Sequence, residues 1–173
     1  MRRIVILFAF MIASFWGVAQ ITVPGTGVTF DFPNKGWKFL QTTNVDKNTT
    51  VYLYSYCAKN VVDSEGDTII PFMRIYVKKN YEESVYDLAY SRWMKQPFEG
   101  IEEFTEGLPV EKGVGYVGAY TDLNDKKDYM FRMIYFKEHS NILEVRLEST
   151  LDTYKELEPE FVSILSTFKV NTK

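Results

Sequence analysis

The chain has very few of the residues that catalytic and metal sites use most often: one cysteine, Cys57, and one histidine, His139. A single cysteine excludes an intramolecular disulfide, so packing must stabilise the fold. A zinc site needs several nitrogen or sulfur ligands and a catalytic triad needs a buried base, so one histidine in an exposed turn favours neither. The sequence therefore predicts no catalytic residue, no metal ligand and no cofactor.

The chain also lacks an excess of positive charge, with 20 basic and 23 acidic residues. A protein that neutralises phosphates needs a concentrated basic face. Here basic residues occur as short pairs among acids, Lys78-Lys79 and Lys126-Lys127, which are typical of solvated strand ends. Nucleic acid is therefore not an expected partner.

Long hydrophobic runs are missing apart from Ile4–Ala13. Two arginines precede this run and the small residues Gly17 and Ala19 follow it, which is the pattern of a secretory signal. A membrane anchor requires roughly 20 apolar residues, and this run is shorter. We expect cleavage between Ala19 and Gln20 and export to the periplasm or the extracellular space. The mature chain should have no transmembrane segment.

Aromatic side chains, in contrast, are abundant: 12 Tyr and 13 Phe contribute to an aromatic content of 16%. This composition favours half-buried strands over a helical bundle. The content of 46% hydrophobic and 25% charged residues suits a globular domain with a packed core. No linker or repeat interrupts residues 20–173, so we expect one domain there.

The first half of the mature chain has the pattern of four strands. Alternating apolar residues at 28–32 and 37–39, joined by a Pro33–Gly36 turn, predict an opening hairpin. A third strand is expected at Thr50–Ala58 and a fourth at Ile69–Lys79.

A helix follows, because Ser84 and Asp87 have the spacing of a capping box, and Pro97 should end it. The segment Glu99–Glu111 holds five acids and predicts a loop with one short edge strand near Phe104. Three strands joined by short turns then form an antiparallel meander. Their expected bounds are Gly113–Thr121, Tyr129–Lys137 and Asn141–Ser149.

The chain should close with helical structure. Thr153 and Glu156 resemble a capping box, but Pro159 is expected to interrupt the helix and start a second one. Beyond it, Phe161 and Phe168 belong to an apolar series with the spacing of a helix docked on a sheet.

The order of these elements resembles the PsbP-like superfamily, the fold of the photosystem II extrinsic protein PsbP and of Ran-binding Mog-type proteins. The resemblance rests on the FDFPNKGW opening, on the order of strands and helices, and on the Phe-x-x-Ile-Leu-x-(Ser/Thr)-Phe pattern at 161–168. It implies an α+β fold, with an antiparallel sheet of about six to seven strands and helices packed on both faces in an α/β/α sandwich.

Members of that superfamily act mainly as binding or assembly factors. No residues here match the Ran-contacting surface or the metal-binding positions of particular members, so neither function is carried over.

Two local features favour structural roles. The turn with Asp63, Glu65 and Asp67 has alternate carboxylates like a calcium loop, but an EF-hand requires Gly and Glu where this chain has Thr68 and Arg74. A polar hairpin turn explains it better, and a weak, irregular calcium site is the alternative. Cys57 continues an alternating strand, so we expect a small buried residue.

The candidate binding residues are Tyr52, Tyr54, Tyr56, Glu102 and Glu103. The three tyrosines share one face of a strand, where they could pack under a helix or offer area with a polar tip to a partner. If strand tyrosines are exposed, we expect them to form one patch with the 99–111 loop. Glu102 and Glu103 are a carboxylate pair, which acid–base catalysis could use across a cleft.

The sequence favours an exported, non-enzymatic binding or assembly module of the cell envelope, with another envelope or secreted protein as its partner. One alternative is a hydrolase that uses carboxylates from the 99–111 loop, which requires two carboxylates about 5 to 10 Å apart in a cleft. Another is a carrier of small ligands, which requires one deep apolar pocket.

Overall fold

The computed structural model describes residues 20–105, 107–108 and 113–171. The predicted signal peptide, residues 1–19, lies outside these ranges, and so does part of the acidic segment before the meander. Within the ranges given, no helix is both long and apolar enough to pass through a membrane.

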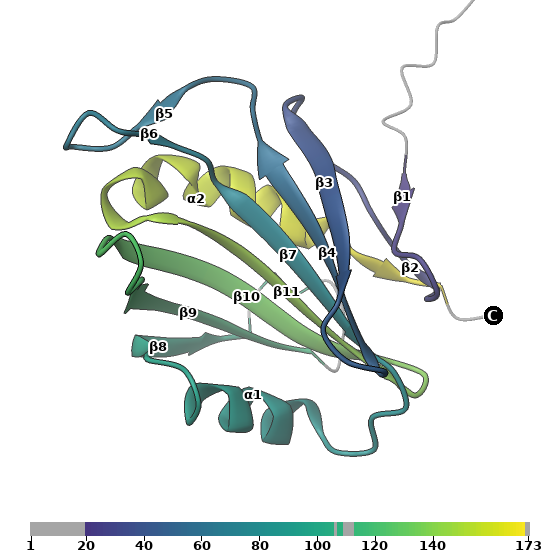
Figure 1. Cartoon of the computed structure of the whole chain (residues 1–173). Helices are drawn as coiled ribbons and strands as arrows, with labels where there is room; N and C mark the ends of the chain where they lie inside the picture. Colours follow the sequence, from purple (N-terminus) through teal and green to yellow (C-terminus); the bar gives the residue numbers. More distant parts are fainter. Residues whose placement is uncertain (1–19, 106, 109–112, 172–173) are drawn as a thin grey trace, which may run out of the picture.

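Seven antiparallel strands form the main sheet, in the order β3-β4-β7-β11-β10-β9-β8 (Figure 1). Their bounds are β3 (Trp37–Asn44), β4 (Thr49–Tyr56), β7 (Phe72–Lys78), β8 (Glu99–Phe104), β9 (Val114–Thr121), β10 (Asp128–Glu138) and β11 (Asn141–Thr150). The predicted meander is confirmed, since β10 pairs with both β9 and β11. With two helices added, the α+β class is confirmed.

The predicted opening hairpin is wrong. β2 (Val28–Phe30) pairs with β1 (Ile21–Thr22) and β12 (Lys169–Val170) in a separate three-stranded sheet, whereas β3 pairs with β4. The rings of Phe30 and Phe168 stack with centroids 4.8 Å apart. β2 therefore packs against the carboxyl-terminal end of the chain and does not pair with β3, the next strand in sequence.

Two other strand predictions need adjustment. The segment expected to be mainly loop begins as the six-residue edge strand β8, which pairs with β9 along Glu102–Phe104. The expected fourth strand is divided, because Pro71 separates β7 from β6 (Thr68–Ile69). β6 pairs with β5 (Val61–Val62), and this pairing confirms a polar hairpin turn between them.

Helix α1 (Val85–Trp93) begins as predicted at Ser84. The backbone N–H of Asp87 donates to the Ser84 hydroxyl, and the Ser84 N–H donates to the Asp87 carboxylate. These two bonds satisfy groups at the helix start that have no partner within the helix. Val85, Leu88 and Ala89 are its buried residues.

Helix α2 (Leu151–Ser166) is continuous, so the predicted interruption at Pro159 is wrong. A proline inside a helix costs about 3 kcal/mol. Here Pro159 is exposed, and Leu157 and Phe161 on either side of it are buried in one cluster, so packing along the whole helix offsets that cost. The predicted cap is also wrong: Thr150 is at the N-cap position, and Thr153 is buried in the first turn.

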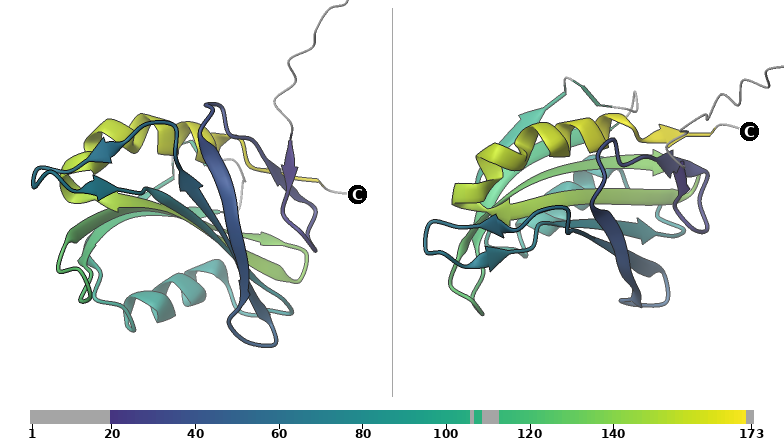
Figure 2. Two further views of the ribbon diagram at one scale, coloured as in Figure 1. Left: turned by 45° about the horizontal axis from the view of Figure 1, so that its top comes forward. Right: turned by 90° about the horizontal axis from the view of Figure 1, so that it is seen from above.

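Alternate residues of the central strands enter two separate clusters. The α2-side cluster includes Ile134, Phe136, Leu143, Val145 and Leu147 with Tyr154, Leu157, Phe161, Ile164 and Leu165 of α2. The α1-side cluster consists of Val85, Leu88, Ala89, Val114, Tyr116, Phe131, Met133, Tyr135 and Ile142. In Figure 1, α2 is drawn above the strands and α1 below them, and Figure 2 shows α2 extending over the sheet. Phe161 and Phe168 are buried in the α2-side cluster, as predicted.

The two rare residues both lie at the surface. Cys57 is exposed, so the prediction of a buried strand residue is wrong. β4 ends at Tyr56, and the Cys57 N–H leaves the sheet to donate to the carbonyl oxygen of Gly36 (2.8 Å). His139 is an exposed turn residue, as predicted, with a φ of 52°.

Candidate binding face beside helix α1

The tyrosines predicted as candidate binding residues lie on the α2 side of β4. Tyr54 is buried, with its ring centroid 5.6 Å from that of Phe30 and 5.5 Å from that of Phe32. Tyr52 and Tyr56 are half-buried and pack against the same cluster. Core packing thus accounts for Tyr54, and binding by Tyr52 and Tyr56 stays a prediction.

Glu102 and Glu103 are exposed on β8, at the opposite end of the sheet from β4. Neighbouring residues of a strand point to opposite faces. Glu102 lines a hollow of about 380 Å³ with Val117 and Met130, whereas Glu103 lies opposite Tyr116 of β9. The two glutamates therefore point to opposite faces of the sheet. Neither lies near the tyrosines of β4.

The expected patch of strand tyrosines does not form. Among the described strand residues no tyrosine is exposed: Tyr54, Tyr116 and Tyr135 are buried and Tyr52, Tyr56, Tyr76, Tyr120 and Tyr129 are half-buried. Among the described aromatic residues, the strongly exposed ones are Phe39 of β3 (53%) and, on α1, Tyr86 (54%) and Tyr90 (62%).

Tyr86, Tyr90 and Met94 form an apolar stripe on the outside of α1. Their spacing of four residues places them on one face of the helix, and Met94 at its end is 71% exposed. We call these three residues the α1 stripe. It is a continuous row of large side chains that the described part of the molecule leaves open to solvent.

Beside α1, one face of the sheet carries charged residues in register. Glu144 lies opposite Tyr135 on one side and Tyr76 on the other, and Arg146 lies opposite Arg74. Because cross-strand partners point to the same face, these side chains all lie on the side of the α1-side cluster. β11 thus presents leucine and valine to α2 and charges to the opposite side.

Ion pairs join these charges. Arg74 forms an ion pair with Glu148, and Arg146 Nε lies 3.1 Å from Glu148 Oε2. Arg92 of α1 reaches the sheet, where its Nε donates to Glu144 Oε2 at 3.1 Å. We call these five residues the ionic cluster. It fixes α1 to β11 through Arg92.

Aromatic rings lie next to the arginines of the ionic cluster, and the cluster is partly buried. The Arg92 guanidinium lies 5.0 Å from the Tyr76 ring centroid, and that of Arg74 lies 5.4 Å from the Phe72 centroid. Burial lowers the pKa of Arg74, and the nearby charge of Arg146 lowers it further. A guanidinium remains charged after such a shift, so Arg74 stays positively charged.

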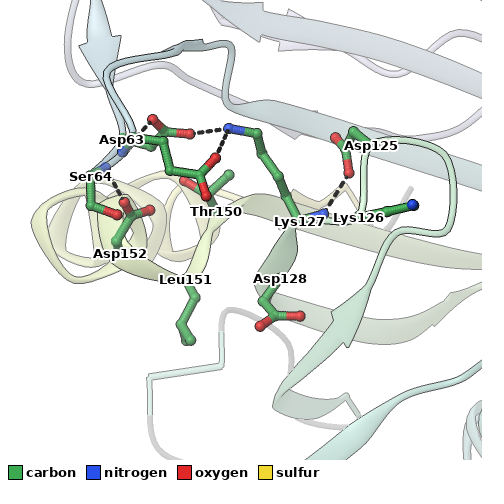
Figure 3. A pocket seen from close by; sticks show the side chains of 10 residues that line it. Asp63, Ser64, Asp125, Lys126, Lys127, Asp128, Thr150, Leu151 and Asp152 are labelled. Atoms are coloured by element: carbon green, nitrogen blue, oxygen red, sulfur yellow. Dashed lines mark hydrogen bonds and ion pairs between the residues drawn. The ribbon is translucent and has the colours of Figure 1, made fainter.

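A second site lies where the β5–β6 turn meets the start of α2 (Figure 3). It is an open hollow of about 630 Å³, and five of its lining residues are acidic. They are Asp63, Glu65, Asp125, Asp128 and Asp152. Its carboxylates make it one candidate for a cation site or for acid–base chemistry.

The carboxylates of this hollow are already engaged. Oxygen atoms of Asp63, Glu65 and Asp67 lie within 4.8 Å of one another, a spacing that suits a metal ion. The Lys127 ammonium donates to all three, at 2.7 Å to Asp67 and 3.3 Å to Glu65. A side-chain cation therefore occupies the centre of the group, and the hairpin-turn interpretation explains it.

The pKa shifts in this hollow also oppose acid–base catalysis. The Ser64 N–H lowers the pKa of Asp152 to about 2, the Lys127 ammonium lowers that of Asp63, and the Tyr129 hydroxyl lowers that of Asp125. A general acid at neutral pH needs a raised pKa. Asp63, Asp125 and Asp152 instead accept hydrogen bonds that hold neighbouring turns together.

Comparisons with known proteins support the fold and little more. No protein-family model matches the chain, and the search of curated proteins gives no match. Among solved structures, the chain is similar to LpqN, described as involved in cell envelope biogenesis of Mycobacterium tuberculosis, with a TM-score of 0.54 and 12% identity over 89% of this chain and 90% of that one.

Two further solved structures are similar. A variant of the protein Mog1 matches with a TM-score of 0.56 and 8% identity, over 88% of this chain and 95% of that one. A Pseudomonas aeruginosa protein of unknown function, PA94, described as a putative regulator, matches with a TM-score of 0.54 and 9% identity, over 80% and 99%. The Mog1/PsbP-like fold expected from the sequence is thus supported by structure, at very low identity.

The sequence analysis did not identify the ionic cluster or the α1 stripe as functional features. The spacing of Tyr86, Tyr90 and Met94 is visible in the sequence. So is the alternation of Glu144, Arg146 and Glu148 with apolar residues. What the sequence alone could not supply is the register that places Arg74 beside Arg146.

Proposed function

We propose that this protein is an exported, non-enzymatic binding or assembly module of the cell envelope. Its partner is another envelope or secreted protein, and the face beside α1 is its binding surface. The observation that carries the proposal is the exposed α1 stripe, on the same helix whose Arg92 joins the ionic cluster. Similarity in fold to an envelope-biogenesis protein and to Mog1 is consistent with it.

The composition of this face suits a protein interface. Tyrosine, methionine and arginine are enriched in interfaces relative to other surface residues, and Tyr and Arg are frequent among residues whose loss weakens binding most. Half-exposed Phe72 and Tyr76 lie beside the arginines. A partner could therefore bury apolar area on α1 and form polar contacts at the sheet.

The layering of the domain belongs to the same proposal. We infer that residues 20–173 form one domain with helices on both faces of the sheet, as the PsbP-like resemblance implies. The division of side chains into an α2-side and an α1-side cluster supports this arrangement. In this arrangement, α2 covers one face of the sheet. The shorter α1 covers only part of the other face, and the rest is accessible to a partner.

The binding surface can be tested by site-specific photo-crosslinking. A photoreactive phenylalanine derivative replaces Tyr90 on the α1 stripe, or Lys155, which is exposed on α2, as the matched control. In cells that produce the protein naturally, we expect one discrete protein adduct from position 90 and none from position 155. Equal adducts from both positions, or none from position 90, would contradict the proposal.

Export has its own test. The mature protein should begin at Gln20, since Ala19 suits the position before a signal cleavage site. Intact-mass measurement of protein from the envelope or the medium checks this. A mass that includes residues 1–19 would exclude cleavage.

A further inference from the structure

We propose that the ionic cluster binds a carboxylate-bearing, acidic segment of the partner protein. This inference rests on the proposed function, because it uses the same face, and it specifies the chemistry of what binds there. It follows from three observations: how exposed each charged side chain is, how many positive and negative side chains the cluster contains, and which residues surround it.

Two of the three arginines of the cluster reach solvent, whereas Arg146 and both glutamates are buried. The side chains of Arg74 and Arg92 are 28% and 24% exposed. Those of Glu144 and Glu148 are 5% and 3% exposed. A partner approaching this face therefore meets guanidinium groups, while the carboxylates that hold them lie underneath.

The charges in the cluster do not balance. Three arginines face two glutamates, and Lys78 adds a further positive charge on the same face of β7. Asp46 and Asp122 act on Lys78 and Arg74 from a distance, and no ion pair among the described residues joins them. One excess guanidinium is thus left to be neutralised from outside, on a protein whose net charge is −3.

Buried donors on this side of the sheet lack partners as well. The Tyr135 hydroxyl is fully buried, directly across from Glu144, and has no hydrogen-bond partner among the described residues. The same holds for Nε1 of Trp93, at the end of α1. Buried polar groups are rarely left without a partner. Both are hydrogen-bond donors, which adds to the donors on this side of the sheet that have no acceptor among the described residues.

The surroundings favour a peptide carboxylate over a free inorganic anion. Phe72 and Tyr76 stack against Arg74 and Arg92, and the half-exposed Val51 and Leu53 continue the face on β4. Stacked guanidinium groups keep their edges available for two parallel bonds to a carboxylate. The apolar residues beside them suit apolar neighbours of that carboxylate in a chain.

The test is a titration of the purified protein with a fluorescent peptide, Glu-Phe-Glu-Leu-Glu, compared with its glutamine counterpart, Gln-Phe-Gln-Leu-Gln. We expect saturable binding of the acidic peptide, about tenfold tighter than that of the neutral one, the size of one charged hydrogen bond. Added salt should weaken it. Equal affinity for the two peptides, or no saturable binding of the acidic one, would overturn the inference.

Variants locate the site. Arg74→Gln should weaken binding of the acidic peptide about tenfold, and Arg74→Lys should restore part of it, because lysine keeps the charge without the fork. Lys155→Gln removes a positive charge from α2 and should leave affinity unchanged. If Arg74→Gln fails to fold, Lys78→Gln provides the same comparison, since no carboxylate forms an ion pair with Lys78 in the described residues. A loss in Lys155→Gln as large as in Arg74→Gln would contradict the site.

Competition separates this ligand from others of the same charge. Inorganic phosphate and vesicles containing anionic lipid are added to the bound acidic peptide. Displacement by either at concentrations equal to the peptide's would overturn the assignment to an acidic protein segment. A crosslinked adduct from position 90 without peptide binding would leave the proposed function standing and remove only this inference.

Discussion

The two faces of the central sheet differ in what they bury. On one face, β10 and β11 present leucine, valine, isoleucine and phenylalanine to the 16-residue helix α2. On the other, residues of the same strands belong to the α1-side cluster and, beside it, to the ionic cluster. The first face is built for stability, and the second places charge where apolar residues would stabilise more.

This difference matters because buried ion pairs contribute little to stability compared with well-packed apolar residues. A purely structural sheet would gain by having leucine at Glu144 and Glu148. Their carboxylates instead hold Arg74, Arg92 and Arg146 at this face. Variants on each face should therefore affect stability and binding in opposite proportions.

The largest loss of stability is expected on the α2 side, from Phe161→Ala. Phe161 is fully buried in the α2-side cluster, and emptying such a site costs about 3 to 5 kcal/mol. Val162→Ala, one residue further along the helix and exposed, is the matched control. Denaturant unfolding measures both. A loss below about 1 kcal/mol for Phe161→Ala would mean that α2 does not stabilise the sheet in this way.

A smaller loss is expected in the ionic cluster, from Glu148→Gln. The substitution leaves Arg74 and Arg146 without their shared carboxylate. Removing one partner of a fully buried pair costs about 3 to 5 kcal/mol, but Arg74 is partly solvated, so we expect about 2 kcal/mol by denaturant unfolding. A loss as large as that of Phe161→Ala would remove the contrast between the two faces.

Parts of this comparison could be predicted from the sequence. The meander and the Ser84 cap were correct, because short turns and a capping box are decided by neighbours in the chain. Alternation in β11 identified a strand with two different faces. The fold class followed from the order of such local signals.

The errors have a common physical cause, which is contact between residues far apart in the chain. β2 pairs with β12 rather than β3, and α2 continues through Pro159, because burial against distant residues outweighs a local signal. The ionic cluster needs the register of β7 against β11, which no local pattern determines. Candidate residues chosen for composition, such as Tyr54, therefore fell in the core.

A still smaller effect concerns the start of α2 and acid pH. The Ser64 N–H lowers the pKa of Asp152 from 3.8 to about 2 in the folded protein. Stability from this bond is fully present above pH 4 and is lost as pH falls through about 2. Asp152→Asn should flatten this acid loss in unfolding curves measured between pH 4 and pH 2. An unchanged acid limb would mean that Asp152 does not brace the turn.

The smallest effect on stability, and the largest on binding, is expected for Tyr90→Ser on the α1 stripe. Tyr90 is 62% exposed and outside both clusters, so its loss should change the free energy of unfolding by less than about 0.5 kcal/mol. Val162→Ser on α2, a comparably exposed site, is the matched control. Affinity for the partner identified by crosslinking at position 90 should fall about tenfold for Tyr90→Ser alone, because exposed tyrosines that bury on a partner carry much of the binding energy. If both variants bind that partner equally well, the stripe is only an exposed helix surface and the two faces differ in stability alone.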